Sequence, residues 1–332
     1  MDPSLPSELL VHICTFLASN TADLAAVARV HSSWSAAAQR VLYSRLATHR
    51  PLHTIATCPR LATLVRSFAL HHDPPSIALL PAALANMSLL LELDLFLDSS
   101  LLHLDASFPL LQRFATSLPW SPLLVRFLHN CPTITQLYLD SPAPFDHLPL
   151  PPAFLPSLSH FTGPPALALL LIPHRPVQHI DLTPTPQSLG LTPDLALSLS
   201  QSSAPVLALA ATTSESARDQ PEGEDENLVG VLKILAVCMA HLRHLRVVTN
   251  TYADTSTFAN VSHQAYFENI AHSLTSLPDL QSCEIWGFHW VSSIKKDMSY
   301  SALTTTTTTW HSPSISTPNY LDDLYQDLIF PY

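Results

Sequence analysis

Glycine is scarce in this chain, with only 5 in 332 residues. Phosphate-binding loops and nucleophile elbows need closely spaced glycines, because their backbone takes conformations that other residues avoid. The sequence therefore excludes a G-x-G-x-x-G dinucleotide loop, a P-loop and a G-x-S-x-G elbow. The glycines are instead far apart, at Gly163, Gly190, Gly223, Gly230 and Gly287.

Charged residues are also few, at 12% of the chain, which is about half the usual share. Lysine and arginine together number 15 against 26 acids, so the formal net charge is -11. An acidic surface repels phosphate backbones. We therefore expect no nucleic acid as the main partner.

Cysteine usage indicates a reducing compartment. The cysteine count is odd and no C-x-x-C occurs, so neither a disulfide framework nor a zinc ribbon is expected. The first residues lack a basic n-region, and the apolar stretches are too short to span a bilayer. We expect an intracellular protein of the cytoplasm or nucleus, without a membrane partner. The cysteines are Cys14, Cys58, Cys131, Cys238 and Cys283.

Hydrophobic residues are plentiful, at 47%, and the first fifty residues predict three short helices. Ser7, Thr21 and one of Ser32 or Ser33 are the expected N-caps. So small a unit, without a metal or a disulfide, has too small a hydrophobic core to be stable on its own. We expect this unit either to pack against the rest of the chain or to bind another protein. The first helix has an apolar stripe at Leu9, Ile13, Phe16 and Leu17.

The N-terminal segment contains a set of motif positions at Leu5-Pro6, Glu8 to Leu10, Ile13, Phe16-Leu17, Asp23-Leu24, Val30, Trp34 and Val41 to Tyr43. With these residues it resembles the F-box, and specifically the F-box-like domains common in fungi. Where family members often read V-C-R-S-W, this chain reads Val30-His31-Ser32-Ser33-Trp34 and keeps the tryptophan. A generic three-helix cap on the following domain is the alternative interpretation.

The resemblance implies a partner and a set of partner-binding residues. The helices would dock on a Skp1-like adaptor protein, which in turn joins a cullin in a ubiquitin ligase. Under this interpretation the chain is a non-catalytic adaptor that holds a protein substrate. The residues that would bind the Skp1-like protein are Leu5, Pro6, Leu9, Ile13, Leu17, Leu24, Val30 and Trp34.

From about residue 55 an irregular pattern Φ-x-x-Φ-x-Φ appears, with Φ apolar, and between Leu90 and Val177 it recurs every 19 to 24 residues. Its second half alternates with period two, which is typical of a strand with one buried face. One such strand cannot bury that face alone, whereas stacked copies form a continuous core. Full copies begin at Leu90, Ile134, Val177, Leu242 and Leu280, and partial copies at Leu64, Leu111 and Leu158.

The predicted fold class is therefore α/β. An F-box-like helical domain at 1–50 is followed at 55–298 by a degenerate leucine-rich-repeat-like solenoid of short parallel strands and helices. Helices are expected at Ile77–Leu84 and Leu228–Ala240. An acidic loop at 212–227 is expected to be disordered. The Ser/Thr-rich tail 299–332 is expected to be loose, with a short helix from Tyr320.

Strand residues between the buried positions would face the target, because aromatic and charged side chains placed this way suit recognition of a protein. An ordinary solvated sheet face is the alternative for each of them. The candidates are Asp94, Phe96, Tyr138, Asp140, Asp181, Arg246, Glu284 and Trp286.

No metal or cofactor is expected despite 18 histidines. The pairs His49 with His53 and His241 with His244 have helical spacing but no obvious third ligand nearby. No local motif positions an activated nucleophile, so we expect no enzyme. An F-box substrate adaptor is thus the leading interpretation. The alternatives are an interaction scaffold without a ligase role and a hydrolase.

Overall fold

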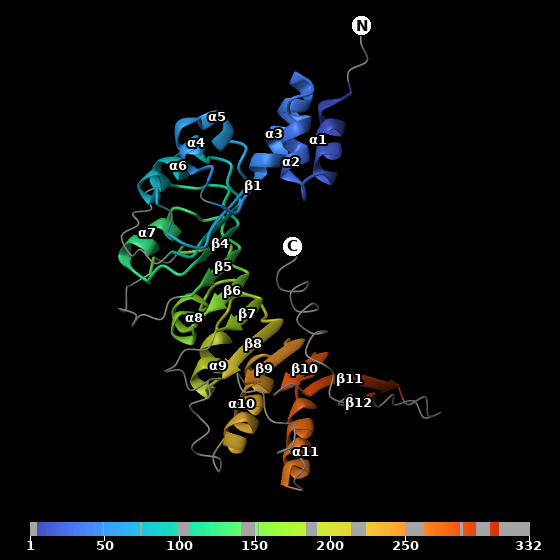
Figure 1. Cartoon of the computed structure of the whole chain (residues 1–332). Helices are drawn as coiled ribbons and strands as arrows, with labels where there is room; N and C mark the ends of the chain where they lie inside the picture. The colour runs from blue at the N-terminus through green and yellow to red at the C-terminus, as the bar shows by residue number, and fades with distance from the viewer. Residues whose placement is uncertain are drawn as a thin grey trace. The chain divides into compact units, whose positions relative to one another are not determined.

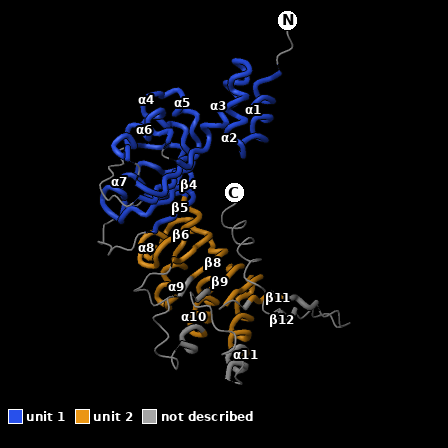
Figure 2. Tube along the Cα trace, viewed as in Figure 1, with its two compact units in different colours: residues 1–157 blue, residues 158–332 orange. Residues whose placement is uncertain are grey.

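A computed structural model describes residues 5–48, 50–73, 75–97, 106–140, 150–151, 153–183, 191–213, 224–249, 262–285, 288–296 and 306–311. The chain divides into two compact units, residues 1–157 and residues 158–332 (Figure 2). Both units combine helices with short strands, so the predicted mixed α/β class is confirmed (Figure 1).

Unit 1 begins with three helices that share a core of their own. The first helix packs against the third, and the second also packs on the third. Their fully buried residues are Leu10, Cys14, Leu24, Ala37 and Ala38. The helices are α1 (Ser7–Phe16), α2 (Thr21–Val27) and α3 (Ser32–Ser44).

The caps of these helices differ from the expected ones. Asn20, rather than Thr21, caps α2, because its Oδ1 accepts hydrogen bonds from the backbone N–H groups of Ala22 and Asp23. The Nδ1 of His31 accepts from the backbone N–H of Ser33 at the start of α3. No side chain caps α1, whose Ser7 is already helical. A cap must precede the first helical residue, and each prediction lay one residue or more too late.

The rest of unit 1 alternates strands with helices. Strands β1 to β5 pair in chain order, and each is parallel to the next. The strands are β1 (Arg45–Leu46), β2 (Ser67–Leu70), β3 (Glu92–Leu95), β4 (Arg113–Thr116) and β5 (Gln136–Leu139). The helices are α4 (Leu52–Thr57), α5 (Pro59–Ala62), the 3-10 turn η1 (Ile77–Leu79), α6 (Leu80–Asn86) and α7 (Pro122–His129).

Unit 2 continues the same alternation and ends in a hairpin. Strands β6 to β10 pair parallel in chain order, and β11 and β12 then add antiparallel strands. The strands are β6 (His160–Gly163), β7 (His179–Leu182), β8 (Ala208–Thr213), β9 (His244–Thr249), β10 (Ser282–Ile285), β11 (Phe288–Lys296) and β12 (Thr306–His311). The helices are α8 (Pro165–Leu171), α9 (Pro193–Leu199), α10 (Glu224–Cys238) and α11 (Ser262–Leu274).

The apolar positions of the sequence pattern form the core of both units. Every apolar position of the five full copies is buried, from Leu90, Leu93 and Leu95 at β3 to the copy that ends at Ile285. One further copy begins at Val206, continues with Leu209 and Ala211 on β8, and was missed. Alanine stands there in place of a large apolar residue, so the pattern was weaker. Figure 1 shows helices α6 to α10 on one side of the strands within their units.

Two predicted loose segments contain regular structure. The segment 212–227 begins in the last residues of β8 and ends in the first turn of α10, and its middle lies outside the described residues. In the Ser/Thr-rich tail, Thr306–His311 form β12 against β11. Threonine is β-branched and fits a pleated strand, which accounts for this correction. The helix expected from Tyr320 lies outside the described residues. Among those residues, no helix is long and apolar enough to cross a membrane.

Candidate protein-binding surfaces

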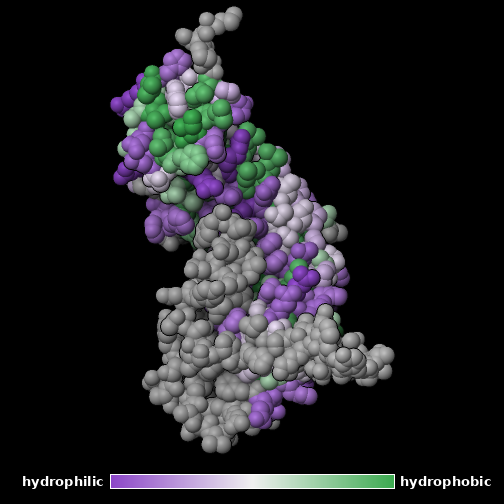
Figure 3. All heavy atoms as spheres, turned by 90° about the vertical axis from the view of Figure 1, so that its right-hand side faces the viewer, coloured by the Kyte–Doolittle hydropathy of each residue, from purple (hydrophilic) through white to green (hydrophobic). Residues whose placement is uncertain are grey.

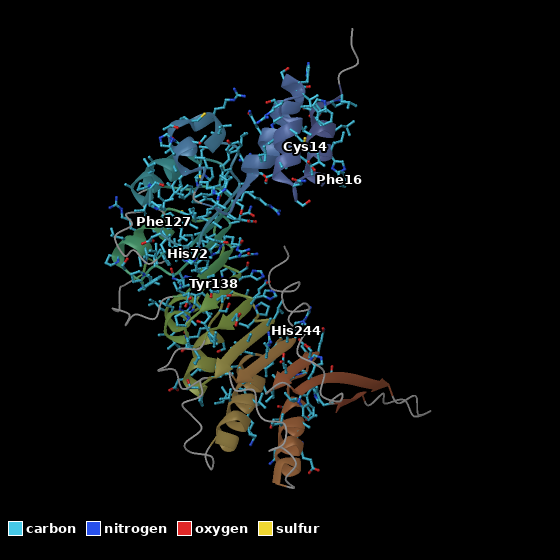
Figure 4. The ribbon with its side chains drawn as sticks, in the orientation of Figure 1. Cys14, Phe16, His72, Phe127, Tyr138 and His244 are labelled. Carbon is cyan, nitrogen blue, oxygen red and sulfur yellow. The ribbon has the colours of Figure 1, made fainter. Side chains whose placement is uncertain are left out.

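Helix α1 has one buried side and one apolar side that is open to solvent. Leu10 and Cys14 point into the three-helix core, at 3% and 0% exposure. Figure 4 labels Cys14 and Phe16, which lie two residues apart on this helix. Figure 3 shows hydrophobic residues gathered over the N-terminal helices. We call the exposed apolar set the N-terminal ridge: Leu5 50%, Leu9 49%, Ile13 39%, Phe16 74% and Val30 73%.

The predicted partner-binding residues divide into three groups. Pro6 and four members of the ridge are exposed. Leu17 and Trp34 are partly buried against the helical core. Leu24 is only 1% exposed, so its side chain supports the bundle from within and is not on the surface.

Phe16 was missing from the predicted set, although it is the most exposed apolar residue of α1. Its ring lies against that of His12, with centroids 4.9 Å apart and an edge-to-face angle of 74°. The helical spacing from Leu9 already contained the signal, because Phe16 lies seven residues further along the same stripe. An exposed aromatic side chain of this kind is a common anchor in protein interfaces.

The side of the sheet formed by the alternate, outward-pointing strand residues is called the open face of each unit. In unit 1 the register aligns its residues in rows across β2 to β5. One row is Ser67, Glu92, Arg113 and Gln136. The next row is Ala69, Asp94, Ala115 and Tyr138. Beyond the strand ends, His71, Phe96 and Asp140 continue the alternation on β2, β3 and β5.

Aromatic rings cluster at the carboxyl end of this open face. The rings of His71 and Phe96 are stacked, with centroids 5.5 Å apart. Phe96 and Tyr138 meet edge to face at 5.7 Å, and Figure 4 labels Tyr138. Strand β4 lies between β3 and β5, and its residue Ala115 is only 2% exposed.

Asp94 lies in the same region and forms an ion pair with Arg113, with 3.7 Å between Oδ2 and a guanidinium nitrogen. Its other oxygen, Oδ1, is buried and makes no hydrogen bond to any residue that the structure describes. Burial raises the pKa of Asp94 above its ordinary value, and the positive charge of Arg113 partly offsets that rise. The carboxylate is therefore incompletely compensated by its own protein.

Histidines dominate one row of the open face of unit 2. The register aligns His160, His179, Ala208 and His244 with Ser282 across β6 to β10. Burial lowers the pKa of His160 to about 4, and the neighbouring His179 adds to the effect. The pKa values of His179 and His244 are also lowered, again chiefly by burial. The Nδ1 of His244 lies 2.8 Å from the hydroxyl of Ser282.

The next row of unit 2 carries charges around one arginine. Nε of Arg246 lies 3.1 Å from Oε2 of Glu284, and their side chains are 25% and 7% exposed. Burial raises the pKa of Asp181, whereas the charge of Arg246 lowers it. Arg246 thus lies between two carboxylates, with Ala210 of β8 between it and Asp181 in the register.

Seven of the eight predicted target-facing residues are described, and they occupy the two open faces. Four lie in unit 1 and three in unit 2, and Glu284 is nearly covered. Trp286 lies outside the described residues. The histidine row was missed, because the prediction singled out the positions between and after the two buried residues of each strand. Strand alternation alone would have identified the position before them.

Among the residues that the structure describes, no group of three His, Cys, Asp or Glu side chains is arranged to hold a metal ion. Residues 2–49 match the model of the F-box-like family. F-box domains are adaptors that typically bind Skp1 within ubiquitin ligase complexes. A comparison of the whole chain with curated proteins finds no match.

Proposed function

We propose that this protein is a non-catalytic substrate adaptor of a Skp1–cullin–F-box ubiquitin ligase. The helices of residues 2–49 bind a Skp1-like protein, and the open faces of the sheet hold a target protein. The chain makes and breaks no bond. Its contribution is to raise the local concentration of a target lysine near the ubiquitin-loaded enzyme. We place this activity in the cytoplasm or nucleus.

The N-terminal ridge carries this proposal. Leu9 and Ile13 are 49% and 39% exposed while Leu10 and Cys14 of the same helix are buried. The helical core is therefore already closed without them. An apolar set of this size on one small bundle costs solubility unless a partner covers it. The match of residues 2–49 to the F-box-like family gives the class of that partner.

We further propose that residues 55–298 form a degenerate leucine-rich-repeat-like array. Each strand with its following helix or turn is one repeat, and the buried Φ-x-x-Φ-x-Φ residues join neighbouring repeats into one core within a unit. Parallel pairing in chain order within both units favours this interpretation. Each unit presents its own open face to a target.

Capture of the full chain by recombinant Skp1 tests the adaptor role. Exchanging both Leu9 and Ile13 for Asp is expected to lower capture at least tenfold, because charged groups would then be buried at the interface. A matched control is Leu197→Asp on α9, where the leucine is 53% exposed. This control is expected to bind Skp1 as the unaltered chain does.

Equal capture of the double variant and the control would show that the ridge does not bind Skp1. If the unaltered chain captured no Skp1, the adaptor role would be wrong and an interaction scaffold without a ligase role would replace it. Circular dichroism of each variant establishes that the helices are retained.

A further inference from the structure

We propose that the open face of unit 1 binds an extended, arginine-bearing segment of the target, with the guanidinium against Phe96 and Tyr138 and beside Asp94. This inference rests on the proposed function and names the chemical class of the target. Its three elements are an aromatic platform, an undercompensated carboxylate and an acidic surrounding.

The aromatic platform exists because Ala115 is small. Neighbouring strands are about 4.8 Å apart, so β3 and β5 are separated by about 10 Å. The rings of Phe96 and Tyr138 nevertheless approach to 5.7 Å between centroids. They approach each other from the two sides of β4, whose residue Ala115 is 2% exposed. With His71 stacked on Phe96, three strands contribute to one ring cluster.

Asp94 provides the negative charge beside these rings. It lies one row from Phe96 on the same strand, since residues two apart point to the same face. Its single ion pair in the described structure is the 3.7 Å contact with Arg113, which is long for a strong charged hydrogen bond. Burial already raises the pKa of this carboxyl group. A second cation would compensate the carboxylate that Arg113 compensates only in part.

The formal charges of the open face of unit 1 sum to a negative value. Its acids are Glu92, Asp94 and Asp140, and its arginines in the described strands are Arg113 and, on β1 opposite Ser67, Arg45. The net formal charge of the face is therefore negative, as is that of the chain at -11. Charge complementarity favours a basic segment over an acidic or neutral one.

Arginine fits this combination better than lysine does. A guanidinium group is planar, stacks on aromatic faces and can donate hydrogen bonds to a carboxylate at the same time. A lysine ammonium has no flat face to place on the rings. In an extended segment every second side chain points to the same side, so alternate residues of the target would meet the face.

A labelled 12-residue peptide of glycine and serine with arginine at three alternate positions is the probe. Fluorescence polarisation measures its binding to the full chain, beside counterparts that carry citrulline, lysine or glutamate. The arginine peptide is expected to bind at least fivefold more tightly than the citrulline peptide. Glutamate is expected to abolish binding. Equal binding of arginine and citrulline peptides would overturn the proposal.

Variants separate the site from the general attraction of an acidic protein. Asp94→Asn and Tyr138→Leu are each expected to weaken arginine-peptide binding at least fivefold, and Tyr138→Phe is expected to retain it. The matched control Asp194→Asn removes an exposed acid at the start of α9 and is expected to change nothing. If Asp194→Asn weakened binding as much as Asp94→Asn, attraction would be unspecific and the proposed site wrong.

Other occupants give distinct results. If analytical ultracentrifugation shows that the chain self-associates and that Tyr138→Leu is monomeric, the open face of unit 1 binds a second copy and the proposal is overturned. Skp1 capture is measured on the same variants. If the unaltered chain captures Skp1 but does not bind the arginine peptide, only the proposed target class is contradicted. Peptide binding without Skp1 capture contradicts only the adaptor role.

Discussion

The imidazole rings of His160 and His179 are parallel, with 4.3 Å between their centroids and 1° between their planes. The two residues are register partners on β6 and β7, so their side chains leave the sheet side by side. Two stacked, partly buried rings cannot both be protonated without repulsion. Protonation of the histidine row therefore opposes folding.

Acid is expected to destabilise the protein through this row. The pKa of His160 is lowered to about 4 in the fold, against about 6.5 when unfolded. Between these values the unfolded chain binds more protons, so the free energy of unfolding falls as the pH drops from 6.5 to 4. Because His160 is partly exposed, we expect it to account for about 1 kcal/mol of the fall in the free energy of unfolding over this pH range. Urea denaturation across this range measures it.

His160→Gln is the variant that isolates this effect. It is expected to lessen the loss of stability between pH 6.5 and pH 4, whereas His53→Gln, at an exposed position of α4, is expected to leave it unchanged. The raised pKa values of Asp94 and Asp181 act in the opposite direction at the acid end, and both variants share them. Identical pH profiles for the unaltered chain and His160→Gln would contradict the prediction.

The sequence predicted the strands on which the recurring apolar pattern has large residues, and it missed β1, β8, β11 and β12. Leucine positions such as Leu93 and Leu137 indicated period-two alternation directly. On β8 the buried position Ala211 gave no such signal. The threonines of β12 resembled a low-complexity run, although their β-branched side chains favour a strand.

The candidate surfaces were predictable only as far as they depend on local spacing. The exposed side of α1 follows from helical periodicity. That Leu24 is buried depends on how three helices pack, which no single helix determines. The approach of Phe96 to Tyr138 requires two strands that are far apart in sequence, with an alanine between them in space. Such a relationship appears only when the register is known.

Two phenylalanines distinguish stability from binding. Phe127 of α7 is fully buried, with ring centroids 5.0 Å from Phe114 and 6.0 Å from Phe108. Phe127→Ala is expected to lower the free energy of unfolding by about 3–5 kcal/mol, because it leaves a cavity. Phe16→Ala removes a side chain that is 74% exposed and is expected to change stability by less than about 0.5 kcal/mol.

Thermal melting and Skp1 capture on both variants check this pair. Phe16→Ala is expected to weaken capture while its melting temperature is retained. If Phe16→Ala melted as early as Phe127→Ala, its side chain would belong to the core, and the ridge would have been defined incorrectly.

The two partners of the Arg246–Glu284 pair are expected to differ in importance. Arg246→Met leaves the carboxylates of Asp181 and Glu284 without the cation between them. Glu284→Gln leaves Arg246 with Asp181. Arg246→Met is expected to lower the free energy of unfolding by about 2–3 kcal/mol and Glu284→Gln by about 1 kcal/mol, since removing one member of a buried pair leaves an uncompensated charge.

The cost of Arg246→Met is also expected to depend on pH. Arg246 lowers the pKa of Asp181, so its removal raises that pKa further above the unfolded value. A carboxyl group that binds its proton more tightly in the fold stabilises the fold as the pH falls. The difference in free energy of unfolding between Arg246→Met and the unaltered chain should therefore become smaller in mild acid. Arg60→Met, at an exposed position of α5, is the control, and an equal deficit in both variants would contradict the argument.

Cysteine labelling should divide the five thiols into two classes. Cys58 and Cys238 are half-buried, whereas Cys14, Cys131 and Cys283 are fully buried. Burial raises the pKa of Cys131 to about 11, and it also raises the pKa values of Cys14 and Cys283. Because the thiolate is the nucleophile, iodoacetamide at pH 8 is expected to give two rapid adducts by mass spectrometry, and five in denaturant.

Cys14 makes this experiment informative about the three-helix bundle. The core of this bundle is small, so local opening should expose Cys14 more often than Cys131, whose neighbours include Phe108. A Skp1-like protein seated on the ridge should hold α1 closed and slow the labelling of Cys14 while that of Cys131 is unchanged. Leu9→Asp with Ile13→Asp should remove this protection. If bound Skp1 slowed both thiols equally, or neither, α1 would not be the element that it covers.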